Sequence, residues 1–187
     1  MKRLIASAAL LIGLVQPSQA APVTWADNGH TYDVITGTTF LTWDQARALA
    51  EWLGGHLVTI TSAAENDFVA DLVRTRGSGN LERYWLGGYQ IGPIGRSEPA
   101  GSWAWVTGEP WLYTNWAPGE PNNGLGGTQH WLHYWPTAGL WDDMENRAGT
   151  MNSYVVEFSV PEPLTLALFA LGLAGIGAVR RSSKPAA

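Results

Sequence analysis

Apolar residues recur at helical spacing in the first third of the chain. The first such stretch begins at Thr42-x-x-Gln45, which has the spacing of a capping box. Its apolar positions recur every three or four residues and form one face: Trp43, Ala46, Ala50 and Leu53. Gly54-Gly55 ends the predicted helix, because glycine readily adopts the backbone conformation of a helix C-terminus.

A second helix is predicted to begin after Ser62-x-x-Glu65, which again has capping-box spacing. The apolar positions of its one buried side are Phe68, Val69, Leu72 and Val73. Gly77 ends it.

Short alternating or wholly apolar stretches predict strands over the rest of the chain. They cover residues 30–34, 56–60, 84–89, 103–106, 131–135, 140–141 and 154–158. There is no internal repeat. Two helices near the start followed by strands predict an α+β domain, with the helices packed on small antiparallel sheets.

Residues 107–127 break this pattern. They are rich in Gly, Pro and Asn and show little periodicity. Because a long irregular segment inside a compact domain is usually functional, we expect a ligand-binding loop here.

The first 20 residues have the pattern of a signal peptide. Lys2 and Arg3 precede an apolar run, which closes on Ser18-Gln19-Ala20, the small-x-small pattern of a cleavage site. The alternative is an uncleaved anchor, for which the apolar run is short. We therefore expect an exported chain that begins near Ala21.

A second apolar run lies at the other end of the chain. Leu164 to Val179 contains no charge and is followed by Arg180, Arg181 and Lys184. An apolar stretch flanked by basic residues predicts a transmembrane helix with a cytoplasmic end. The alternative is a hydrophobic tail that packs on the domain. The predicted organisation is thus a signal peptide (1–20), one domain (21–159) and a membrane segment (160–187).

Charge and composition narrow the class of partner. Between these ends the chain has six basic and fifteen acidic residues, a formal charge of −9. Such a surface repels nucleic acid and suits cations. The chain has no Cys, so packing must stabilise the domain without disulfides.

Tryptophan is unusually frequent. Eight of the eleven Trp residues fall between Trp85 and Trp141. For most of them we expect core packing, because buried Trp supplies a large apolar area. For Trp111 and Trp116, which lie inside the long loop, stacking on a sugar face stays open as the alternative to core packing.

Candidate metal ligands occur in two places. Glu120-Pro121-Asn122 lies in the long loop, and Asp142-Asp143 follows Trp141 about twenty residues later. Carboxylate and amide oxygens without Cys or clustered His predict a hard cation such as Ca²⁺. The alternative is that these residues belong to an ordinary turn and strand end.

The order of several motifs resembles the C-type lectin-like domain over residues 25–159. They are Gly55-His56-Leu57-Val58, Ser62-Ala63-Ala64-Glu65-Asn66, Trp85-Leu86-Gly87, Glu120-Pro121-Asn122, Leu140-Trp141-Asp142-Asp143 and Tyr154-Val155-Val156-Glu157-Phe158. The resemblance implies the C-type lectin-like fold with its long loop. In that family Glu-Pro-Asn marks sites that chelate the vicinal hydroxyls of mannose, glucose or fucose through Ca²⁺.

The resemblance also implies a ligand set. Ca²⁺ would be held by Glu120, Asn122, Gln129, Asp142 and Asp143, and the sugar would contact the first four. Two positions depart from the family: Asp142 stands where the family has Asn, and Gln129 where it has Glu. The two changes leave the ligand charge unaltered. Thr128 is the alternative to Gln129, because the loop is one residue longer here.

The C-terminal segment resembles the PEP-CTERM sorting signal. Val160-Pro161-Glu162-Pro163, an apolar stretch and Arg180-Arg181 occur in that family's order. The resemblance implies cleavage by a membrane protease of the exosortase class. It also implies a Gram-negative bacterium, with the protein at the cell surface or in an extracellular matrix and attached to the membrane at least transiently.

Two functional hypotheses follow. The first is a calcium-dependent lectin that binds a carbohydrate or glycoconjugate. The second is a calcium-independent module for protein or matrix contacts on the same scaffold. We do not expect an enzyme, because the sequence shows no nucleophile with a base, no paired acid and base, and no phosphate loop.

Overall fold

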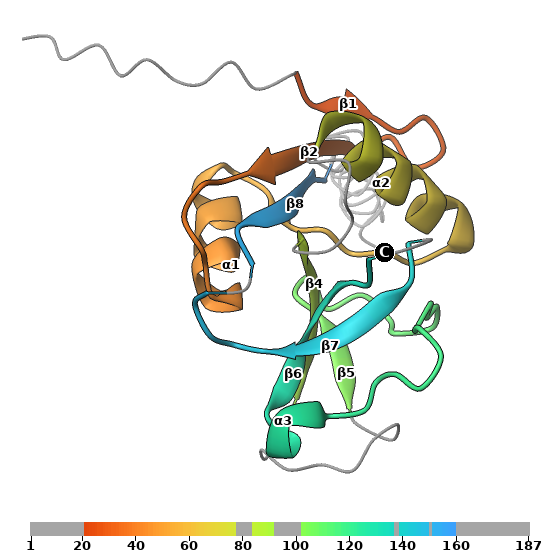
Figure 1. Ribbon diagram of the computed structural model, residues 1–187. Helices are drawn as coiled ribbons and strands as arrows, with labels where there is room; N and C mark the ends of the chain where they lie inside the picture. Colours follow the sequence, from red (N-terminus) through yellow and green to blue (C-terminus); the bar gives the residue numbers. More distant parts are fainter. Residues whose placement is uncertain (1–20, 78–83, 92–101, 137–138, 150, 160–187) are drawn as a thin grey trace, which may run out of the picture.

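The computed structural model describes residues 21–77, 84–91, 102–136, 139–149 and 151–159 (Figure 1). The predicted signal peptide and the predicted membrane segment lie outside these residues. The described part is α+β, as the sequence predicts, and consists of helices beside one sheet.

Three helices and eight strands follow one another along the described residues. The helices are α1 (Trp43–Trp52), α2 (Ala63–Arg76) and the single turn α3 (Gly124–Gly127). The strands are β1 (Val23–Thr24), β2 (Thr31–Thr36), β3 (His56–Leu57), β4 (Tyr84–Gln90), β5 (Trp103–Trp105), β6 (Gln129–Tyr134), β7 (Trp141–Glu145) and β8 (Ser153–Phe158).

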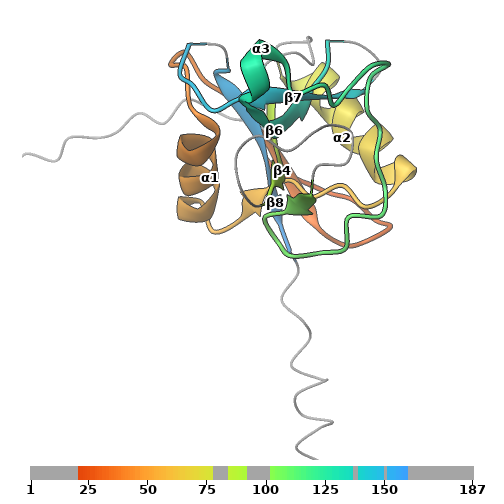
Figure 2. The ribbon, with the colours of Figure 1, turned by 90° about the horizontal axis from the view of Figure 1, so that it is seen from below.

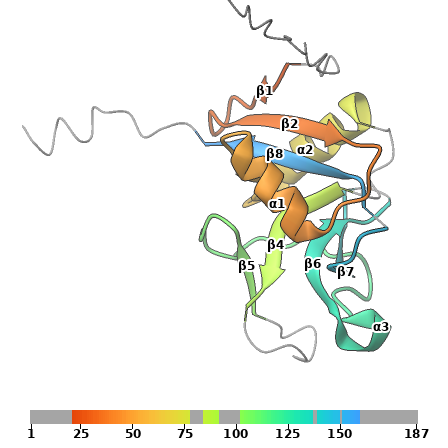
Figure 3. The same cartoon turned by 90° about the vertical axis from the view of Figure 1, so that its left-hand side faces the viewer.

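The strands form one sheet rather than the several small ones predicted. Its order is β1-β2-β8-β4-β6-β7, while β3 pairs with β8 and β5 with β4. All these pairs are antiparallel except β4 with β8, which run parallel at Tyr84↔Ser153 and Trp85↔Tyr154. This parallel pair joins the half of the sheet formed by β1, β2 and β8 to the half formed by β4, β6 and β7, which borders the long loop. Helix α1 lies against β8, β3 and β4 (Figure 3).

Strand β3 is shorter than predicted. The sequence predicts a strand over residues 56–60, but only His56 and Leu57 pair in the sheet with β8. Val58 and Ile60 are instead fully buried in the core, where Val58 N–H donates to the carbonyl of Val155 (3.0 Å). An apolar run alone cannot distinguish such a buried segment from a strand.

The capping box of α1 is confirmed. The Thr42 hydroxyl accepts from the N–H of Gln45, and the Gln45 side chain accepts from the N–H of Thr42. The predicted apolar face is buried at three positions, Trp43, Ala46 and Ala50. Leu53, the fourth, is instead 40% exposed.

The second capping box forms only in part. The Ser62 hydroxyl accepts from the N–H of Glu65, as predicted. The Glu65 carboxylate, however, accepts from the N–H of Thr61 (2.8 Å) and the hydroxyl of Tyr32 (2.6 Å). A buried tyrosine from β2 therefore competes for the carboxylate that the local motif would use.

Aromatic rings pack the region between the long loop and the sheet. Trp103, Trp105 and Trp141 are buried, and the half-buried rings of Trp111 and Trp116 pack against them. The Trp105 and Trp111 centroids are 4.3 Å apart, and those of Trp103 and Trp116 are 4.8 Å apart. Trp111 and Trp116 thus pack against the core rather than standing free in the loop.

Asn66 connects α2 to the start of β7. Its Oδ1 accepts from the indole N–H of Trp141 (2.8 Å), and its Nδ2 donates to the carbonyl of Gly139 (3.1 Å). Asn115 of the long loop donates to the same carbonyl (3.0 Å). One buried side chain thereby fixes the segment that carries Asp142.

We predict that Asn66→Ala lowers the free energy of unfolding by about 2 kcal/mol, because it leaves a buried indole N–H without an acceptor. Urea unfolding followed by circular dichroism measures this. The matched control is the exposed neighbour in Asp67→Asn, which should be close to neutral. Equal effects of the two substitutions would contradict the role given to Asn66.

Candidate cation site

Three carboxylates converge where the long loop meets β7. Glu120 comes from the loop, and Asp142 and Asp143 come from β7. One oxygen of each lies within 4.8 Å of the others, and this is the one such acidic or His group among the described residues. Asp142 and Asp143 are buried, and Glu120 is half-buried.

Asp143 holds the loop against the strand. One of its oxygens accepts from the N–H of Asn122 (3.0 Å), and the other accepts from the N–H of Asn123 (2.8 Å). The peptide bond between Glu120 and Pro121 is cis. Glu120 and Asn122 lie together, and the Asn122 amide donates to the Glu120 carboxylate (2.8 Å).

The turn after Asn122 is stabilised by its own side chains. Asn122 Oδ1 accepts from the N–H of Gly124 (2.6 Å), and Asn123 Oδ1 accepts from the N–H of Gln129 (3.1 Å). Asn123 has a left-handed backbone (φ 50°), which Asn tolerates better than most residues. This turn brings the chain from the loop into β6.

Gln129, rather than Thr128, lies beside the loop residues. A Cβ on Gly124 would stand 2.4 Å from Gln129 Oε1 and 2.9 Å from Asn122 Oδ1. The two side-chain oxygens therefore lie close to the same point. Gln129 is buried, whereas Thr128 is exposed after α3.

His133 also lies in this region, although no motif in the sequence indicates a function for it there. Its Nε2 lies 3.0 Å from Asp142 Oδ2, so the Nε2–H donates to the carboxylate. His133 is 2% exposed and pairs directly with Asp142 across β6 and β7. In the sequence, His133 alternates with Trp131 and Trp135, which indicates a packing or hydrogen-bonding role, but its partner Asp142 follows only from the strand register.

The carboxylates of the site are partly or fully buried and repel one another when ionised. Burial and then the charges of Asp142 and Asp143 raise the pKa of Glu120 to about 7. Burial also raises the pKa of Asp143, although the two backbone N–H donors act in the opposite direction. Among the described residues no Lys or Arg forms an ion pair with the three. A bound cation would remove this repulsion.

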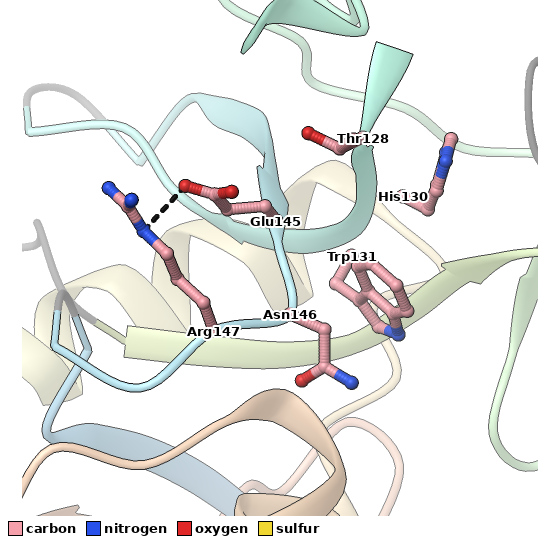
Figure 4. Close-up of a pocket in the computed structure, with 6 residues that line it drawn as sticks. All are labelled: Thr128, His130, Trp131, Glu145, Asn146 and Arg147. Atoms are coloured by element: carbon pink, nitrogen blue, oxygen red, sulfur yellow. Dashed lines mark ion pairs between the residues drawn. The ribbon is translucent and has the colours of Figure 1, made fainter. Parts of the chain in front are cut away.

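A shallow pocket of about 240 Å³ lies on the flank of the β6–β7 hairpin (Figure 4). Its lining residues are Thr128, His130, Trp131, Glu145, Asn146 and Arg147. Arg147 pairs with Glu145 (2.5 Å), and the Asn146 side chain accepts from the N–H of Trp43 (2.8 Å). These polar groups already bind one another or α1, so the pocket does not compete with the carboxylate cluster as a cation site.

Comparison with known families gives two matches along the chain. Residues 39–153 match the Lectin C-type domain, and residues 159–181 match the PEP-CTERM protein-sorting motif. Within the described part of the chain no helix is long and apolar enough to cross a membrane, and the predicted C-terminal helix lies outside that part.

Curated relatives agree with the first match. The hepatic lectin of Gallus gallus is 35% identical over 106 residues, which are 56% of this chain and 44% of that protein, so the chain spans less than half of its length. The C-type lectin lectoxin-Lio1 of Erythrolamprus poecilogyrus is 35% identical over 134 residues, 67% of this chain and 75% of that protein.

Solved structures show the same fold. The C-type carbohydrate-recognition domain of cow CD23, solved in the presence of a GlcNAc2Man3 oligosaccharide, superposes with a TM-score of 0.59 and 25% identity. That match covers 78% of this chain and 100% of the CD23 domain. A calcium-independent type II antifreeze protein superposes with a TM-score of 0.55 and 25% identity, over 76% of this chain and 98% of that one.

The raised pKa of Glu120 predicts a pH dependence in the cation-free protein. Its folded-state pKa of about 7 lies above the ordinary value of 4.5, so the folded state binds the extra proton between these values. Stability from this group is therefore present at low pH and falls as pH rises through about 7. In chelator, the wild type should lose more stability between about pH 5 and about pH 8 than Glu120→Gln does, as measured by urea unfolding. Equal losses would show that Glu120 titrates normally.

Proposed function

Because the chain belongs to the family of C-type lectin domains, we propose that it is an exported protein that binds carbohydrate through a calcium ion. The observation that carries this proposal is the convergence of Glu120, Asp142 and Asp143, whose oxygens lie within 4.8 Å of one another without a Lys or Arg partner among the described residues. Such a cluster is unfavourable unless a cation or protons neutralise it.

Five residues form the proposed ligand set: Glu120, Asn122, Gln129, Asp142 and Asp143. All offer carboxylate or amide oxygens, which suit a hard cation such as Ca²⁺. Asp143 and its two backbone N–H donors keep the loop beside β7. His133 positions Asp142 through the bond from its Nε2–H, as outer-shell groups commonly do for metal ligands.

Sugar recognition would use the same side chains. A hydroxyl of a bound sugar donates to a carboxylate and accepts from an amide N–H. Glu120 with Asn122 offers one such pair, and Asp142 with Gln129 offers the other. The hydrogen bond from Asn122 to Glu120 supports the first pair, and Gln129 lies beside Asn122 in the same loop region. We propose vicinal hydroxyls of the mannose, glucose or fucose type.

The proposed location rests on the two terminal segments of the chain. Residues 1–20 would be removed as a signal peptide, and the sorting motif at residues 159–181 would be recognised by a protease of the exosortase class. We propose the outer surface or extracellular matrix of a Gram-negative bacterium, with membrane attachment through the C-terminal segment. The domain binds rather than catalyses, and its charge of −9 makes nucleic acid an unsuitable partner.

A second candidate is a calcium-independent module for protein or matrix contacts. It is favoured by the likeness to the calcium-independent type II antifreeze protein. It also agrees with the hydrogen bonds of Asp143, which hold the loop without a cation. On this second hypothesis the three carboxylates share protons instead of binding a cation.

Retention on a mannose resin tests the proposal. The wild type should bind in millimolar calcium, the usual range for extracellular calcium modules, and elute with EDTA. Chelation or mild acid releases the sugar, because the ligands must be deprotonated to hold the metal. Retention that persists in EDTA would contradict the mechanism.

Single substitutions test which of the proposed ligands bind calcium. Glu120→Gln should lose retention, and Gln129→Ala should weaken calcium binding in a titration. Asp71→Asn, an exposed acid of α2, is the matched control and should behave as wild type. Unaltered calcium affinity of Gln129→Ala would exclude Gln129 from the ligand set.

A further inference from the structure

Large apolar side chains are exposed at the C-terminal end of α1. Trp52 is 77% exposed, Leu53 is 40% exposed and Leu49 is 39% exposed. Their spacing of three and four residues places them on one side of the helix. We call these three residues the α1 patch. The residues of α1 that are buried against the sheet are instead Trp43, Ala46 and Ala50.

The last described residues of the chain lie beside the segment that follows α1. A Cβ on Gly55 would lie 2.5 Å from the carbonyl oxygen of Glu157 and 3.0 Å from Cδ1 of Phe158. His56 Nε2 lies 3.0 Å from the hydroxyl of Ser159. The residues that follow α1 therefore contact the last described residues of the chain. In Figure 2 the end of β8 and β3 lie toward one side of the domain, and α3 lies at the opposite side.

The covalent distance to the apolar tail is short. Leu164 begins the apolar run and is five residues beyond Ser159. Five residues span at most about 18 Å even when fully extended. With the tail in a bilayer, Ser159, which contacts His56 shortly after α1, is therefore held within about that distance of the apolar region.

We propose that the α1 patch is a membrane-contact surface, with Trp52 and Leu53 entering the interfacial region of the bilayer that holds the C-terminal tail. This inference rests on the membrane attachment proposed above. Trp suits this position, because its amphipathic ring is favoured at the headgroup level. Glu51, the acidic neighbour of Trp52, pairs with Arg47 (2.9 Å), which offsets its charge at the surface.

The contact would orient the domain. The candidate cation site lies next to α3, since Asn123 caps that helix and Gln129 follows it. Because α3 lies at the opposite side from the end of β8, a domain seated on the α1 patch presents the cation site away from the bilayer (Figure 2). Glycans on the exported side of this membrane would then reach the site without obstruction by lipid.

The absence of Cys permits a direct test. Trp52→Cys and Thr128→Cys are each made in residues 21–187, labelled with an environment-sensitive fluorophore and reconstituted into phosphatidylcholine vesicles. Thr128 is exposed and caps the C-terminus of α3, so it serves as the control on the opposite side. Flotation reports tail insertion, and quenching by doxyl-labelled lipid reports contact of the label with the bilayer.

We expect both proteins to float, with the label at residue 52 quenched at least twofold more than the label at residue 128. Equal quenching of the two labels in floating protein would overturn the inference but leave membrane attachment intact. A label at residue 52 that is shielded from water but not quenched by lipid would show that a second protein copy covers the patch, which also overturns it. Protein that does not float would contradict both the attachment and the patch. Calcium and sugar binding are measured separately, so their loss would not be confused with any of these outcomes.

Discussion

The carboxylate of Asp143 connects the long loop to the sheet, and the geometry of the candidate site depends on this connection. Its two oxygens accept from consecutive backbone N–H groups, those of Asn122 and Asn123. The loop is thereby placed so that Glu120 faces β7. Burial raises the pKa of Asp143 against the effect of these two donors, and burial together with the charges of Asp142 and Asp143 raises the pKa of Glu120. Asp143 therefore both orders the loop and belongs to the proposed cation site.

Packing replaces disulfides in supporting this loop. The chain has no Cys, and the segment before Glu120 is held instead by Trp111 and Trp116 against buried Trp105 and Trp141. Asn66 and Asn115 add hydrogen bonds to the carbonyl of Gly139 at the start of β7. The aromatic residues that cluster in the sequence thus supply the rigidity that a binding site on an irregular loop requires.

The sequence alone predicted the features that depend on neighbouring residues. The helix that begins after Thr42 could be predicted because its cap involves residues three positions apart. The Glu120, Asp142 and Asp143 set could be proposed because the motifs have a recognisable order. Features that depend on residues far apart in the sequence could not be predicted in this way. The hydrogen bond from His133 to Asp142 depends on the register of β6 and β7. The Glu65 carboxylate binds the hydroxyl of Tyr32, which is 33 residues away in the sequence, and so does not complete its capping box.

The choice between Gln129 and Thr128 shows the same limit. Loop length left both positions open as ligand candidates, and no local pattern in the sequence indicates that the turn of α3 leaves Gln129 buried and Thr128 exposed. The parallel pair of β4 and β8 likewise has no local signal, because an apolar run does not reveal its partner.

Thermal unfolding with and without calcium tests the central claim most directly. A cation that binds only the folded state must raise the melting temperature as its concentration increases. We predict a rise for the wild type in millimolar calcium, reversed by EDTA, and a much smaller rise for Glu120→Gln. A melting temperature that calcium leaves unchanged in the wild type would contradict the account and favour a calcium-independent scaffold.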